Sequence, residues 1–286
     1  MTNLRIPQYG FTLIELMVSL ALGLIIMLAA TQLFITNQLS FNLQRGMGNV
    51  QENGRFAIDY INSTVRSSEY SSATTADEYL NAGVITDITQ VPGLDDADFV
   101  SLNDETALGV GSSDQLVVRQ WVSAEMTNFR DCEGNVVPTE RFVVSRYFVD
   151  SDDTAGSTAA LRCDAGFYAE GDLTVTNYED DGVVLLSTID SFQVLIGIAA
   201  TPTPPIGQRF PVRYMTVKDY ADLSAPRPII TALRVGVLVR SSESTGESFG
   251  APANIQVLDT VVLGNDINDK RVHRLFTSTL ALRNAI

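Results

Sequence analysis

Glu15 is the side chain whose position most needs a chemical explanation. It carries the only charge in the stretch Gly10–Ala30, which is otherwise almost entirely apolar. A helix of about 20 apolar residues matches the ~30 Å hydrocarbon core of a bilayer. A carboxylate inside such a helix costs ~2.5–3.5 kcal/mol on insertion scales and usually has a function. We therefore expect a membrane helix with a functional charge near its start; the alternative is an ordinary anchor with an incidental glutamate.

The few cysteine and histidine residues limit the catalytic and metal chemistry that the chain can support. Cys132 and Cys163 are the only cysteines, and His273, between Arg271 and Arg274, is the only histidine. A zinc site or a nucleophile activated by histidine would have only His273 to serve it. We interpret His273 as a partly exposed residue of a strand. No G-x-S-x-G or P-loop pattern occurs, so we expect no enzyme activity, no catalytic residue, no cofactor and no metal site.

Two acidic segments leave calcium binding open as an alternative. Asp150–Asp153 and Glu179–Asp181 are rich in carboxylates, the ligands that calcium prefers. Neither segment has the glycine at the sixth position and the glutamate at the twelfth of an EF-hand loop. The net charge of −15 disfavours direct nucleic-acid binding, which needs a cationic face. We interpret the acidic segments as solvated turns.

The helical pattern continues beyond the apolar run but becomes amphipathic. Val50, Ala57, Ile61 and Val65 recur at helical spacing among polar residues. We therefore predict one helix over residues 11–67, with a transmembrane part at about 11–33 and a second half that packs on a head domain. Three glycines in the second half, at positions 46, 48 and 54, each weaken a helix by about 1 kcal/mol relative to alanine and are candidates for a flexible joint.

Strand patterns dominate the head domain, which we place at residues 68–286. Alternating or β-branched apolar residues mark six strands. These strands are Gln115–Val122, Arg141–Asp150, Val183–Leu186, Asp190–Ala199, Ile229–Arg240 and Val272–Leu282. Several strands after one long helix predict an α+β fold, in which the helix packs on an antiparallel β-sheet.

The charges beside the apolar run indicate its orientation. Arg5 is the only Lys or Arg before Arg45, so the positive-inside tendency places the N-terminus in the cytoplasm and the head in the periplasm. The periplasm is oxidising, and we therefore expect a disulfide between Cys132 and Cys163. The alternative is a pair of buried free thiols.

The residues Gly10-Phe11-Thr12-Leu13-Ile14-Glu15 resemble the processing site of type IV prepilins and type II secretion pseudopilins. The resemblance implies that residues 1–10 are a leader peptide and that a prepilin peptidase cuts after Gly10. It also implies that Phe11 becomes the N-methylated first residue of the mature protein. In this reading Glu15 is the carboxylate on which assembly depends.

Four further stretches resemble the PilW type of minor pilin: Val50–Ala57 (VQENGRFA), Ser113–Arg119, Asp131–Gly134 and Leu275–Asn284. This resemblance implies a structural role in the priming or tip complex of a type IV pilus. The implied partners are other minor pilins, the major pilin, the prepilin peptidase, the membrane and the pilus machinery of the inner membrane. The implied location is first the inner membrane, with a single pass, and then the pilus at the cell surface.

Two alternatives remain open. One is the J-type pseudopilin of type II secretion, which shares the processing motif and the helix. The other is a tip adhesin that binds a surface or receptor through the segments Ser68–Ser113 and Ile206–Pro228.

Overall fold

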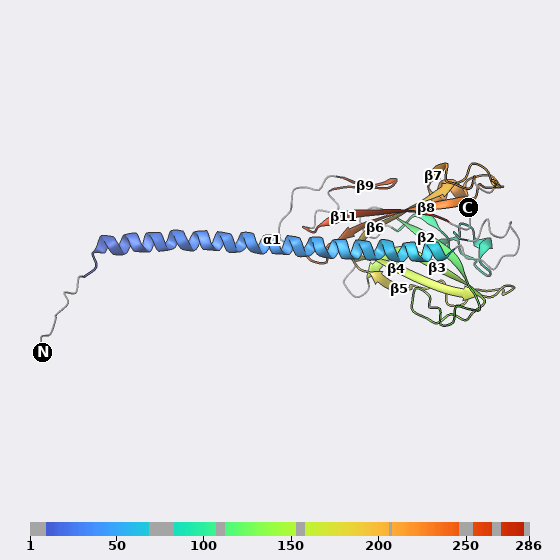
Figure 1. Cartoon of the computed structure of the whole chain (residues 1–286), viewed down its shortest axis with the longest axis horizontal. Coiled ribbons are helices and arrows are strands. Elements are labelled where there is room, and N and C mark those ends of the chain that lie inside the picture. The colour runs from blue at the N-terminus through green and yellow to red at the C-terminus, as the bar shows by residue number, and fades with distance from the viewer. Residues whose placement is uncertain are drawn as a thin grey trace.

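The computed structural model describes residues 10–68, 83–106, 112–152, 158–205, 208–245, 254–264 and 270–282. One long helix, α1 (Leu13–Ser67), leads into a head built from antiparallel strands. Figure 1 shows that only the second half of α1 lies against the head, while the first half extends away from it. The predicted α+β class is confirmed, but the strands form two main sheets where we expected one.

The first sheet has five strands in the order β1-β2-β3-β4-β5, and each strand is antiparallel to its neighbour. Its strands are β1 (Leu102–Thr106), β2 (Ser113–Val122), β3 (Arg141–Asp152), β4 (Thr158–Tyr168) and β5 (Val183–Leu186). Two single 3₁₀ turns, η1 (Ile88–Gln90) and η2 (Ala97–Phe99), precede this sheet.

The second sheet has four strands in the order β11-β8-β6-β7, and these are also antiparallel. Its strands are β6 (Ile189–Ile198), β7 (Arg213–Met215), β8 (Ile230–Arg240) and β11 (His273–Ala281). A short helix, α3 (Val217–Ala221), follows β7, and β9 (Ile255–Val257) with β10 (Thr260–Val262) makes a separate hairpin.

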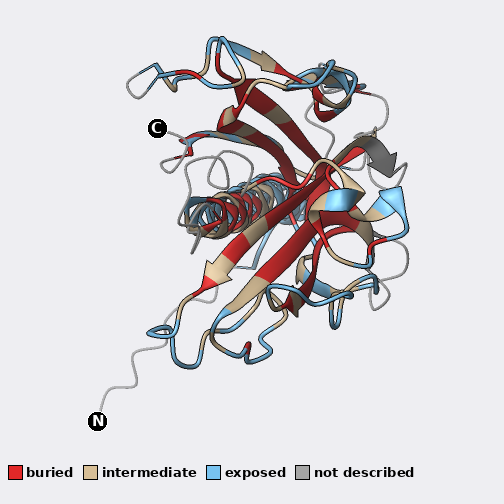
Figure 2. Ribbon diagram, turned by 90° about the vertical axis from the view of Figure 1, so that its right-hand side faces the viewer, coloured by how far each residue is buried: buried red, intermediate tan, exposed pale blue. Residues whose placement is uncertain are grey.

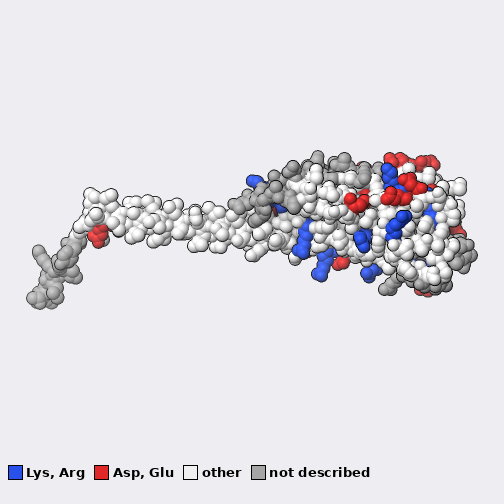
Figure 3. Space-filling model, turned by 90° about the horizontal axis from the view of Figure 1, so that it is seen from above, with Lys and Arg blue, Asp and Glu red and all other residues white. Residues whose placement is uncertain are grey.

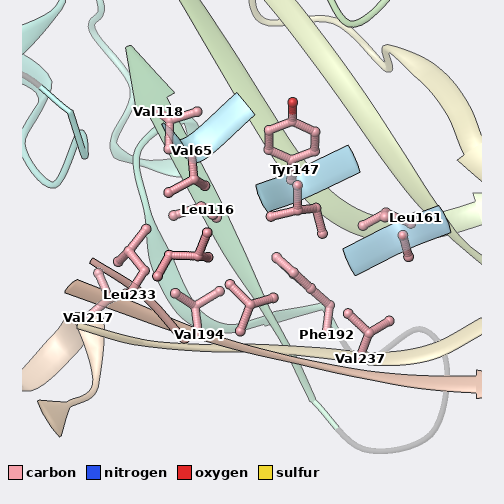
Figure 4. Close-up of a cluster of buried hydrophobic side chains, with 14 of the residues drawn as sticks. Val65, Leu116, Val118, Tyr147, Leu161, Phe192, Val194, Val217, Leu233 and Val237 are labelled. Carbon is pink, nitrogen blue, oxygen red and sulfur yellow. The ribbon is translucent and has the colours of Figure 1, made fainter. Parts of the chain in front are cut away.

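The core lies where α1 meets both sheets. Figure 2, which looks along α1, shows the two sheets diverging above and below the helix, which lies in the angle between them. The buried helix residues are spaced by three or four positions, so they form one face; they are Gly46, Val50, Gly54, Ala57, Ile61 and Val65. Figure 4 shows Val65 among Leu116, Tyr147, Phe192 and other side chains from both sheets.

The glycines of α1 allow close packing of the helix on the head. The helix is continuous through positions 46, 48 and 54, so the flexible joint that we considered is not present in the structure. A Cβ atom at Gly54 would overlap the ring of Phe276 on β11, whereas one at Gly48 would meet nothing within 4 Å. A glycine at position 54 is therefore required for the close contact between α1 and β11. The packing of Phe276 against the helix offsets the low helix propensity of this glycine.

Strand β4 is the largest element that the sequence patterns did not predict. Its alternation is interrupted by small residues and by the buried charges of Arg162 and Asp164. The guanidinium of Arg162 donates to the carbonyl oxygens of Asp181 and Gly182 in the loop before β5. Groups of the loop before β5 form hydrogen bonds with both charged side chains. The two residues can therefore occupy buried positions of the strand where the alternation rule predicts apolar residues.

Buried polar side chains at the start of β2 join the two sheets. The Asp114 carboxylate accepts from the backbone N–H of Val194 on β6 at 2.7 Å, and the Ser113 hydroxyl accepts from that of Phe192 at 3.2 Å. Gln115 donates to the carbonyl oxygens of Asp98 and Val100, both at 2.7 Å. These bonds satisfy backbone groups that strand pairing alone leaves open.

A disulfide joins Cys132, in the loop after β2, to Cys163 on β4, with Cα atoms 6.2 Å apart. This is the pair for which we expected a bridge. Cys163 is fully buried in the main core, and Cys132 packs against that core. The bridge therefore ties the loop between β2 and β3 to the first sheet.

Replacing Gly54 with alanine tests the close contact between α1 and β11. We expect Gly54→Ala to lower the free energy of unfolding by about 1–3 kcal/mol, because the new methyl group overpacks against Phe276. Gly48→Ala is the control, since it is exposed and should raise stability by up to about 1 kcal/mol through helix propensity. Chemical denaturation would measure the free energy of unfolding of both variants. If the two substitutions stabilise the protein equally, Gly54 does not lie in close contact with Phe276.

Removing the disulfide tests its contribution to the head. With a sequence separation of 31, the chain-entropy model predicts that the double variant C132S/C163S loses about 3–4 kcal/mol of stability. Reductant should destabilise the wild type but leave the double variant unchanged. Complete alkylation of both thiols without prior reduction, in protein exported to the periplasm, would refute the bridge.

Candidate functional site

The N-terminal end of α1 is built by a capping residue and a carboxylate. Thr12 is the N-cap, and its hydroxyl accepts from the backbone N–H of Glu15 at 3.3 Å. Such a cap satisfies one of the free donors of the first turn, and a negative charge there is favoured by the helix dipole. The Glu15 side chain is exposed. A cationic group from another molecule can therefore reach it.

Beyond this first turn, α1 presents a long uncovered apolar surface. All residues of the helix from Leu13 to Gln38 are exposed, and the segment has the length and composition of a membrane span. Figure 3 shows this part of the helix as a rod with almost no charge, whereas Lys, Arg, Asp and Glu lie mainly on the head. An apolar surface of this extent marks a membrane or protein interaction site.

The predicted processing residues lie directly before this helix. Phe11 is 85% exposed, and Gly10 has open space around its Cα. Residues 1–9 of the expected leader lie outside the part of the chain that the structure describes. The structure therefore places Gly10, Phe11 and Glu15 together at one accessible end of the molecule, far from the head (Figure 1).

The disulfide brings together a cluster of carboxylates that sequence reasoning recognised only in part. Glu133, Asp164 and Asp180 each offer an oxygen atom, and these atoms lie within 4.8 Å of one another. Of these three, only Asp180 belongs to an acidic segment that we had considered for calcium. A signal for the other two is present in the sequence, because each cysteine of the bridge is followed directly by an acidic residue.

The environment of this cluster opposes its full ionisation. The pKa of Asp164 is raised to about 7, mainly by burial; the Arg146 guanidinium opposes this rise, and the charges of Asp180 and Glu133 add to it. Burial is also the main cause that raises the pKa of Glu133, with contributions from Asp180 and Asp131. Arg146 lies 3.1 Å from the Asp164 carboxylate. Arg146 therefore compensates the charge of Asp164 directly.

His273 is the first residue of β11 and is partly exposed as a residue, as expected, but its side chain turns inward and joins a second charged cluster. Its side chain is 5% exposed, and its Nε2 lies 3.1 Å from the carboxylate of Asp190. Arg240 pairs with the other oxygen of Asp190 and also donates to the carbonyl of Ser187. These three side chains come from β6, β8 and β11 and pair with one another at one end of the second sheet. We therefore interpret the cluster as a structural ion-pair network.

Two protein-family models match the chain, one at the start of α1 and one in the head. Residues 5–31 match the family model described as the prokaryotic N-terminal methylation motif, and residues 146–284 match the model described as type IV pilus-assembly protein W. The second match covers just under half of the chain. No curated protein matches the sequence.

Among solved structures, a type IV-like pilin from Thermus thermophilus matches with 12% sequence identity and a TM-score of 0.40. The match covers 88% of this chain and 98% of that chain. At this TM-score we draw no conclusion from the likeness. The methylation motif at the start of the helix and the PilW match in the head agree with the exposed apolar helix and its carboxylate, and together they indicate a minor pilin of the type IV pilus, of the PilW type.

Proposed function

We propose that this chain is a structural subunit of the priming or tip complex of the pilus, where it acts with other minor pilins and not as an enzyme. The observation that carries the proposal is the division of α1. Its second half is fixed in the head by one buried face, while Leu13–Gln38 is exposed and apolar. A rod of this kind needs lipid around it before assembly and neighbouring helices around it in the fibre.

We further propose that α1 crosses the inner membrane once, with the head in the periplasm. Arg5 supplies the positive flank on the cytoplasmic side. The Cys132–Cys163 disulfide supports an oxidising location for the head. The exposed segment spans roughly 40 Å at ~1.5 Å per residue, which is enough to cross the ~30 Å core with some length to spare.

In this proposal the prepilin peptidase removes residues 1–10 and Phe11 is then methylated. Gly10 suits the position before the cleaved bond, because it has no side chain that could clash with the peptidase. Cleavage also removes Arg5, so no Lys or Arg side chain remains before Arg45. The α-amine of Phe11 is then the nearest cation to Glu15 along the mature chain.

Glu15 has the position and the charge to set the register of an incoming subunit. A lone carboxylate in hydrocarbon is costly, and pairing with an α-amine offsets the desolvation of both groups. The amine of one subunit reaches the level of Glu15 in a neighbour when the two helices are displaced along their axes. A pseudopilin of type II secretion would use the same pair, but the PilW match over residues 146–284 favours the pilus.

Mass spectrometry of the protein from its native host tests the processing step. We expect a mature N-terminus at Phe11 that carries one methyl group. A Gly10→Val variant should retain residues 1–10, because the added side chain blocks the peptidase. Recovery of assembled wild-type protein that still begins at Met1 would contradict the proposal.

Replacing Glu15 tests the assembly step. We expect Glu15→Leu to leave cleavage and head folding unchanged but to reduce incorporation into pili and into complexes with other minor pilins. Glu15→Gln separates charge from polarity, and Glu52→Gln is the matched control, since it removes an exposed carboxylate from the half of α1 that lies along the head. Quantitative blotting of sheared pili and of co-purified pilins measures the effect. Incorporation of Glu15→Leu at the wild-type level would remove Glu15 from the mechanism.

A further inference from the structure

The carboxylate cluster next to the disulfide is assembled from three separate segments of the head. Glu133 lies in the loop after β2, Asp164 on β4 and Asp180 in the loop before β5. The bridge joins the residues directly before two of them, Cys132 and Cys163, and so holds Glu133 beside Asp164.

Two backbone N–H groups and the side-chain amide of Asn135 hold the outer two carboxylates in place. The backbone N–H of Ala165 donates to one oxygen of Glu133 at 3.3 Å, and Asn135 donates to the other at 3.0 Å. One oxygen of Asp180 accepts from the N–H of Gly182 at 2.7 Å. The positions of these carboxylates are therefore set by the fold.

Asp164 supplies the observation that points to a ligand. Its side chain is fully buried, with 0% exposure. Its Oδ2 atom receives the guanidinium of Arg146 and the N–H of Glu179, but its Oδ1 atom has no hydrogen-bond partner. A buried oxygen without a partner is costly, and native structures normally satisfy it with a protein group, a water or an ion. A cation that bridges Asp164, Glu133 and Asp180 would satisfy this oxygen.

The charge of the cluster matches a divalent cation. Three carboxylates lie together, and the ion pair seen there among the described residues is that of Arg146 with Asp164, so full ionisation gives the cluster a net negative charge. All of the available ligands are oxygen atoms, which favour hard cations over the metals that prefer nitrogen or sulfur. Asp180 is exposed, and the cluster is thus open to ions from solvent on one side.

We propose that Glu133, Asp164 and Asp180 form a binding site for one divalent cation of the calcium class, held together by the Cys132–Cys163 bridge. Calcium fits better than magnesium, because it accepts irregular sets of carboxylate and carbonyl oxygens. This proposal departs from the expectation, drawn from the sequence, that the chain binds no metal. It does not depend on the proposed role in the pilus.

Titration of the detergent-solubilised full-length protein with CaCl₂ tests the site by isothermal calorimetry and by the shift of the melting temperature. The main variant is Asp180→Asn, because Asp180 is exposed and its loss should leave the fold intact. Glu133→Gln is the second variant. Asp181→Asn is the matched control, since it is an exposed neighbour that carries the same charge but lies outside the cluster. Circular dichroism verifies that each variant is folded.

We expect the wild type and Asp181→Asn to bind one calcium ion with a dissociation constant in the range of extracellular modules, roughly 10⁻⁴–10⁻³ M, and to gain thermal stability. Asp180→Asn and Glu133→Gln should each weaken binding by about tenfold or more, because each removes a charged ligand. Two results would overturn the proposal. One is no binding by the wild type at calcium concentrations well above this range, and the other is equal binding by Asp180→Asn and Asp181→Asn.

Discussion

The structure depends on the packing of one helix face between two sheets. Small and β-branched residues recur every three or four positions in the second half of α1, and this stripe closes the core on one side. Gly54 lets the helix approach β11 closely. Because this face is committed to the head, the rest of the helix cannot fold back to bury its own apolar residues. Leu13–Gln38 must therefore find its cover in lipid or in other subunits.

The rest of the head is held together by buried polar contacts and by one disulfide. Asp114 and Ser113 connect the first sheet to β6, and the Cys132–Cys163 bridge fixes a long loop to β4. These features hold the parts of the head together, and the second half of α1 packs in the same core.

Much of this fold could be predicted from local patterns, and the exceptions have physical reasons. The alternation of apolar residues predicts β3 and β8 closely, and the stripe from Val50 to Val65 predicts the buried face of α1. Strand β4 escaped prediction because its buried charges are paired elsewhere in the fold, Arg162 with carbonyl oxygens of the loop before β5 and Asp164 with Arg146 on β3. The carboxylate cluster escaped for the same reason, since only the folded chain brings its three segments together. The end of the molecule that carries Glu15, in contrast, is a continuous local motif and is readable from the sequence.

Site-specific photo-cross-linking in the native membrane tests most directly whether the protruding half of α1 is the assembly surface. A photoreactive residue at Ile25, which is 62% exposed on the helix, is compared with one at Val261, which is 48% exposed on the β9–β10 hairpin. The account predicts that Ile25 cross-links to the membrane helices of other pilins in cells that assemble pili, and that these products disappear when the other minor pilins are deleted. If Ile25 yields no pilin adduct in piliated cells while the head position does, the head and not the helix would make the assembly contacts, and the account would be contradicted.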